Sequence, residues 1–188
     1  MSHVRCFQET MKSARNLLLI AVAALLIFCG YQWYLRSKAF GALPTSIGVE
    51  AIKEIRLVPG FPQWLVFGSS GYFLYEIDEK TALHIQQAGL SYLNGASLSP
   101  RFLDNDPQES RRQFRSWSAS PLLPELTAYT PEGRGFWSGL VHARFSPEFE
   151  RQVLTAAREP GAYYTSNHHG DILVVMPKLR IAIFSWYQ

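Results

Sequence analysis

Two adjacent histidines and a nearby aspartate form the cluster of this chain that could most readily bind a metal: His168, His169 and Asp171. Two imidazoles and a carboxylate are ligands that suit Zn²⁺. Adjacent residues on a strand point to opposite faces, however, and adjacent loop residues rarely bind one ion together. His84 and His142 would have to approach through the fold, and the chain has no His-Glu-x-x-His helix. A solvated turn is therefore the simpler interpretation, and a metal-dependent enzyme or hydrolase is the alternative.

Two glycine–serine segments fall short of known catalytic motifs. The segment 135–139 contains a serine between glycines, but its spacing is not that of the Gly-x-Ser-x-Gly nucleophile elbow. The segment 68–71 lacks the length and the lysine of a phosphate-binding P-loop. We expect both segments to be turns, and the sequence predicts no catalytic residue and no cofactor.

Three arginines form the only basic cluster in the part of the chain after residue 38: Arg111, Arg112 and Arg115. On a helix, Arg111 and Arg115 would share a face and could hold a phosphate or carboxylate of a lipid or a cell-wall ligand. Several carboxylates lie close by in the sequence, which favours local charge pairing on a solvated surface instead.

The last two predicted strands, 172–176 and 179–187, are apolar on both faces, as strands covered on both faces are. The simpler expectation is that helices and a long loop cover the sheet. The alternative is an apolar face that binds another protein. Its aromatic anchors would come from the following residues: Phe102, Trp117, Tyr129, Trp137, Phe184 and Trp186.

An apolar segment lies near the N-terminus, before the domain that must position these side chains. Leu17–Leu35 is a run of nineteen residues in which only Gln32 is strongly polar. At about 1.5 Å per helical residue this length spans the hydrocarbon core of a bilayer. Aromatic residues at the end of the run favour a retained anchor over a cleaved signal peptide. Phe28 before Cys29 argues against a lipoprotein, which requires a small residue there.

The charge distribution supports a membrane topology rather than nucleic-acid binding. Residues 1–38 contain five basic residues and one acidic residue, whereas the remainder contains thirteen basic and fourteen acidic residues. A nucleic-acid-binding protein would concentrate positive charge on its folded domain. The bias predicts a cytoplasmic N-terminal segment at 1–16, a transmembrane helix at 17–35, a linker at 36–46 and an extracytoplasmic domain at 47–188. Both cysteines precede this domain, so it contains no disulfide.

Apolar periodicity predicts an α+β domain with an antiparallel sheet of about five to seven strands and two or three helices. Helices are expected at 81–93, at 108–117 and from a Ser146 cap to Arg158. The expected strands are 52–58, 63–67, 72–77, 136–145, 163–166, 172–176 and 179–187.

The favoured function is a non-enzymatic, single-pass protein of a bacterial inner membrane. Its periplasmic domain would bind a protein partner, as an envelope-complex subunit or an immunity protein does. The near-neutral domain and the aromatic candidates motivate this hypothesis.

Overall fold

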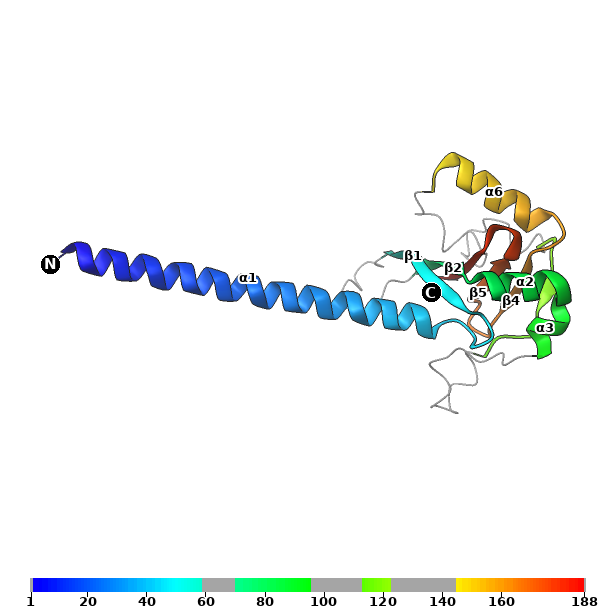
Figure 1. The fold of residues 1–188 in the computed structure, drawn as a ribbon, viewed down its shortest axis with the longest axis horizontal. Helices are drawn as coiled ribbons and strands as arrows, with labels where there is room; N and C mark the ends of the chain where they lie inside the picture. The colour runs from blue at the N-terminus through cyan, green and yellow to red at the C-terminus, as the bar shows by residue number, and fades with distance from the viewer. Residues whose placement is uncertain (1, 59–69, 96–112, 123–144, 188) are drawn as a thin grey trace. The chain divides into compact units, whose positions relative to one another are not determined.

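The computed structural model describes residues 2–58, 70–95, 113–122 and 145–187, and it divides into two compact units, Met1–Ser37 and Lys38–Gln188. Residues 2–37 of the first unit are helical, as part of α1 (Ser2–Gly41) (Figure 1). From Arg15 onward α1 is long and apolar enough to cross a membrane, and its most apolar window is entirely unburied. Ile27, for example, is 73% exposed. The first unit therefore contains an apolar, exposed helix that is suited to be a membrane anchor or a signal sequence.

The second unit is built on a six-stranded antiparallel sheet. Its strands are β1 (Val49–Val58), β2 (Ser70–Ile77), β3 (Ser118–Ala119), β4 (Tyr163–Ser166), β5 (Ile172–Met176) and β6 (Ile181–Tyr187). They lie in the order β1-β2-β6-β5-β4-β3, and each neighbouring pair is antiparallel. The predicted α+β class with an antiparallel sheet is confirmed.

Helices pack against both faces of this sheet. On one face, α2 (Glu79–Ala88) and α3 (Leu90–Gly95) contribute Ile85 and Leu93 to a buried cluster with Tyr75 of β2. On the other face, α6 (Pro147–Arg158) contributes Val153 to a second cluster with residues of β5 and β6. Two apolar faces each bury their side chains against helices, which explains why β5 and β6 are apolar throughout.

The start of α6 confirms the cap predicted from the sequence. Ser146 Oγ accepts a hydrogen bond of 3.2 Å from the amide of Phe149, and Pro147 occupies the first turn. Proline suits this position because its missing N–H would have no helical acceptor there. The turn 167–170 also lies between β4 and β5, as expected.

The helix expected at 81–93 is instead two helices, α2 and α3, separated at Gly89. Gly89 has φ of 54°, and a Cβ there would lie 2.8 Å from the hydroxyl of Tyr163. A glycine is needed because the backbone is left-handed and the tyrosine occupies the space of a side chain. The first helix also starts earlier than predicted, because Asp78 caps it by accepting a 2.7 Å bond from the amide of Thr81.

Residues 113–117 are not helical, in contrast to the prediction of a helix at 108–117. They run beside β4, where the amide of Arg115 donates to Ser166 O at 2.9 Å and Thr165 Oγ1 donates to Arg115 O at 2.7 Å. Phe114 and Trp117 are 4% and 3% exposed. Burial of these two rings in the core outweighs the local helical preference.

The expected linker at 36–46 also differs in the structure. Helix α1 continues to Gly41, and Leu43 and Ile47 are fully buried. Tyr75 Oη donates a 2.6 Å hydrogen bond to Ala39 O. Residues from Lys38 onward therefore belong to the packed domain. The predicted strand 179–187 begins only at Ile181, because Pro177–Leu179 form a 3-10 turn, η3, that ends at Arg180 with φ of 54°. The strand predicted at 63–67 and residues 136–144 of another lie outside the described residues.

Candidate functional site

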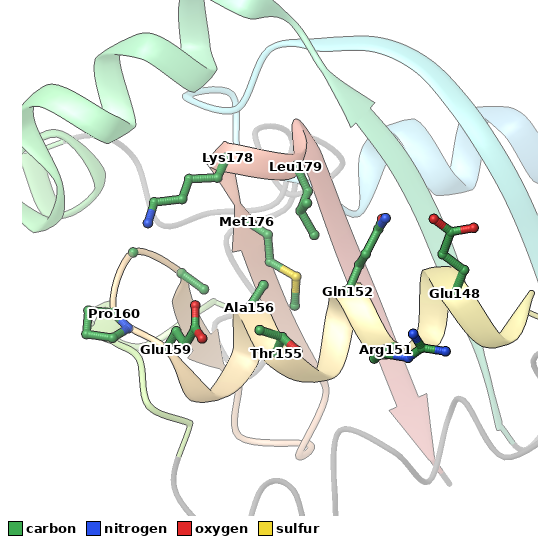
Figure 2. Close-up of a pocket in the computed structure, with 12 residues that line it drawn as sticks. Glu148, Arg151, Gln152, Thr155, Ala156, Glu159, Pro160, Met176, Lys178 and Leu179 are labelled. Atoms are coloured by element: carbon green, nitrogen blue, oxygen red, sulfur yellow. The ribbon is translucent and has the colours of Figure 1, made fainter.

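A groove lies between α6 and the turn that follows β5, with a volume of about 380 Å³ (Figure 2). Its floor is apolar: Met176 of β5 is 1% exposed and Ala162 is 2% exposed. Ala156 and Leu179 extend this apolar surface from the two walls. The groove is large enough for one or two side chains of a ligand.

The helix wall of the groove follows from the periodicity of α6. Val153 and Ala157 are buried against the sheet. Four of the polar residues that line the groove lie next to this buried stripe and recur at helical spacing: Glu148, Gln152, Thr155 and Glu159. The sheet burial of α6 therefore fixes which of its polar residues face the groove.

Hydrogen bonds hold both walls of the groove. Ser120 Oγ donates to Glu159 O at 2.6 Å and accepts from the amide of Ala162 at 3.0 Å, which fixes the end of α6 to the start of β4. On the opposite wall, Gln86 Nε2 donates to Pro177 O at 3.2 Å and ties η3 to α2. The groove is thus a formed feature of the fold.

Charged residues of both signs surround the apolar floor. Glu148 and Arg151 lie at one end in Figure 2, whereas Lys178 and Glu159 lie toward the other. Gly161 has φ of 112°, and a Cβ there would come within 3.3 Å of Lys178 Cε, so a glycine lets the lysine stem lie close to the backbone. Within the described ranges none of these four charged residues forms an ion pair with another. Side chains of both charges, positive and negative, can therefore contact a ligand in the groove.

The residues around His168 form a tight turn rather than a convergent set of ligands. Asn167 Oδ1 accepts from the amides of His169 (2.9 Å) and Asp171 (3.0 Å), and Asn167 Nδ2 donates to Asp171 Oδ2 at 2.8 Å. Both histidines are exposed. In the part of the chain that the structure describes, no three His, Cys, Asp or Glu side chains could hold one metal ion. Zinc binding by this cluster stays a prediction. Measuring the zinc content of the purified wild-type protein and of the His169→Ala variant tests it.

The predicted aromatic anchors occupy different environments. Phe184 and Trp186 are half-buried on β6 and pack against Phe73, with ring centroids 6.0 and 4.7 Å away. Trp117 lies in the core, where its amide donates to Asn94 Oδ1 at 2.7 Å, so little of its ring can reach a partner. Phe102, Tyr129 and Trp137 lie outside the described residues, as does His142.

The three predicted arginines are only partly described. Arg115 is exposed on the extended segment beside β4, whereas Arg111 and Arg112 lie outside the described residues. The helical arrangement that would have placed Arg111 and Arg115 on one face is not present at Arg115. Anion binding by these three arginines stays a prediction, because only Arg115 lies within the described residues.

A second charged region covers the β1–β2 side of the sheet. Lys53 Nζ lies 2.5 Å from Glu76 Oε2, Arg56 Nη2 lies 3.1 Å from Glu54 Oε1, and Arg180 pairs with Glu50. The hydrogen bond from Lys53 lowers the pKa of Glu76. Burial, followed by the neighbouring Glu54 carboxylate, raises the pKa of Tyr72.

No family model, curated protein or solved structure matches this chain. Sequence reasoning missed the groove residues Arg151, Glu159 and Lys178. The exposed stripe of α6 was visible in the sequence, but only the packing of α6 beside η3 joins it to Lys178.

Proposed function

We propose that this chain is a single-pass membrane protein whose second unit binds a protein partner without catalysing a reaction. The groove between α6 and η3 carries this proposal. An apolar floor with charged residues of both signs around it suits a protein segment that presents an apolar side chain between charged neighbours. The helix α1 supplies the anchor.

The proposed location is a bacterial inner membrane, with a cytoplasmic N-terminus and the domain in the periplasm. The excess of basic residues before the apolar segment supports this orientation. The partner would be another envelope protein, for which this chain acts as a complex subunit or as an immunity-like inhibitor. Fused to the C-terminus, a reporter enzyme that works only in the periplasm should be active. A reporter that works only in the cytoplasm should be inactive at the same position. Activity of a cytoplasmic reporter alone would contradict the location.

The binding proposal is tested by affinity purification of the full-length protein from detergent-solubilised membranes of its host. A protein that co-purifies with the wild type should be lost with Thr155→Trp, because the indole would fill the groove. It should be weakened by Arg151→Glu, which reverses a charge beside the floor. Arg158→Glu is the matched control, since Arg158 is exposed on the same helix but does not line the groove.

The affinity for the purified partner is then measured with each variant. A loss of tenfold or more for Thr155→Trp corresponds to about 1.4 kcal/mol, which is typical for one residue that contributes strongly to an interface. Equal binding by the wild type, Thr155→Trp and Arg151→Glu would remove the groove as the partner site.

A further inference from the structure

Strand β1 is the long edge of the sheet, whereas the opposite edge is the two-residue strand β3. Among the described strands, β1 pairs only with β2. The backbone groups on its outer side are therefore available to a further strand, as far as the described ranges show. Natural proteins usually shorten, charge or cover such an edge, because it otherwise pairs with another chain.

The two halves of β1 differ in regularity. Register shifts interrupt its pairing with β2 between Val49 and Ala51 and between Ile52 and Glu54. From Glu54 to Val58 the pairing is continuous, with Ile55 opposite Phe73 and Val58 opposite Ser70. Glu54–Val58 is therefore the regular part of this edge, and it follows directly on the irregular stretch 49–53.

The faces of this regular half have opposite character. Ile55 and Leu57 are half-buried apolar residues that pack against the first core cluster. Glu54 and Arg56 lie on the other face, where their side chains are 29% and 40% exposed. A strand that continued the sheet would bury apolar area on one face and would place charges beside charges on the other.

The sequence around Ile55 is complementary to itself when two copies run antiparallel. A two-fold axis at Ile55 places Ile55 opposite its counterpart, and Glu54 of each copy opposite Arg56 of the other. An axis at Glu54 or at Arg56 would instead place two carboxylates or two guanidinium groups opposite each other. An axis at Leu57 would place Arg56 opposite Val58. Opposite charges in facing positions stabilise a strand pair and like charges destabilise it, so the register centred on Ile55 is favoured.

We propose that two copies of this chain pair through the outer edge of β1, antiparallel and centred on Ile55, so that their sheets join into one. The contact is isologous, as in most homodimers, and it closes because both copies use the same edge. It brings Ile55 of both copies together above the apolar cluster and assembles Glu54 and Arg56 of both copies into four alternating charges. This self-pairing is independent of the groove and of its partner.

Disulfide trapping in native membranes tests the register. In full-length protein with Cys6 and Cys29 replaced by serine, Ile55→Cys should give a disulfide-linked dimer on mild oxidation. Directly opposed residues have Cβ atoms about 4.5–5.5 Å apart, close to what a disulfide needs. Leu57→Cys is the matched control. Its two copies would be four residues apart along the strands, about 13 Å, and should remain monomeric.

Charge exchange tests the pairing on the same background. Adding Glu54→Arg to Ile55→Cys should slow cross-linking about tenfold, because two attractive pairs become two repulsive ones. Adding Arg56→Glu as well should restore it. Thermal unfolding of each variant, followed by tryptophan fluorescence, verifies that the domain is folded. Wild-type protein in detergent should also sediment as a dimer at high concentration.

Three results would overturn the proposal: no cross-link with Ile55→Cys in folded protein, equal cross-linking through Leu57→Cys, or failure of the double charge exchange to restore cross-linking. A monomer at every concentration of the wild type would count against it as well. The charge variants leave the groove untouched, so partner binding measured in parallel separates this proposal from the preceding one.

Discussion

Replacing Gly48 with alanine should destabilise the domain through a contact that is distant in sequence. A Cβ on Gly48 would lie 1.6 Å from Asp78 Oδ2 and 2.7 Å from Thr81 Oγ1. The Asp78 carboxylate must then rotate away from α2 and lose its bonds to Thr81 N (2.7 Å) and Thr81 Oγ1 (3.0 Å). The 3.2 Å bond from Gly48 N to Thr81 Oγ1 is strained as well.

The magnitude follows from these contacts. Loss of an N-cap costs about 1–2 kcal/mol, and the additional hydrogen bond about 1 kcal/mol. Alanine returns about 0.4–1 kcal/mol by restricting the unfolded chain. The net loss in the free energy of unfolding is about 2 kcal/mol. For a domain of this size it lowers the melting temperature by about 4–8 °C.

Equilibrium unfolding of the full-length protein in mild detergent, followed by tryptophan fluorescence, measures this loss in a double-mutant cycle. Asp78→Ala alone removes both hydrogen bonds to Thr81 and should cost about 2–3 kcal/mol. In that background Gly48→Ala should cost less than about 1 kcal/mol, because the clashing carboxylate is gone. Gly95→Ala is the control, since nothing lies within 4 Å of a Cβ there. Additive costs of Gly48→Ala and Asp78→Ala would refute the reasoning.

Three further predictions concern the turn after β4, the β1–β2 side of the sheet and the end of the groove. Asn167→Ala should lower the free energy of unfolding by about 2–3 kcal/mol, because three hydrogen bonds of a side chain that is 4% exposed are lost. His168→Ala should change it by less than about 0.5 kcal/mol; similar losses for both would contradict the proposed turn. Because the pKa of Tyr72 is raised, the unfolded state ionises first, and stability should fall as the pH rises above about 10. Melting temperatures between pH 8 and 11 should decline less steeply in Tyr72→Phe, and parallel curves would count against this assignment. Ser120→Ala should cost about 1–3 kcal/mol in chemical denaturation, because Glu159 O and the amide of Ala162 lose their partner; an unchanged midpoint would show that this hydroxyl does not hold the groove.

Local patterns in the sequence determined the elements whose stability is decided within a few residues. The apolar helix at 17–35, the Ser146 cap of α6 and the glycine-containing turn after Ser166 follow from side-chain type and spacing. The apolar strands β5 and β6 also indicated a sheet covered on both faces. These features depend on hydrophobic periodicity and on hydrogen bonds between near neighbours.

Contacts between distant residues decided the remaining features. Gly89 ends α2 because Tyr163 occupies the adjacent space, and Phe114 keeps its segment extended because its ring belongs to the core. The groove exists only where α6 lies beside η3, and the order of the strands makes β1 the long edge. None of these relations is encoded in a local pattern, because each is fixed by the shared burial of side chains that lie far apart along the chain.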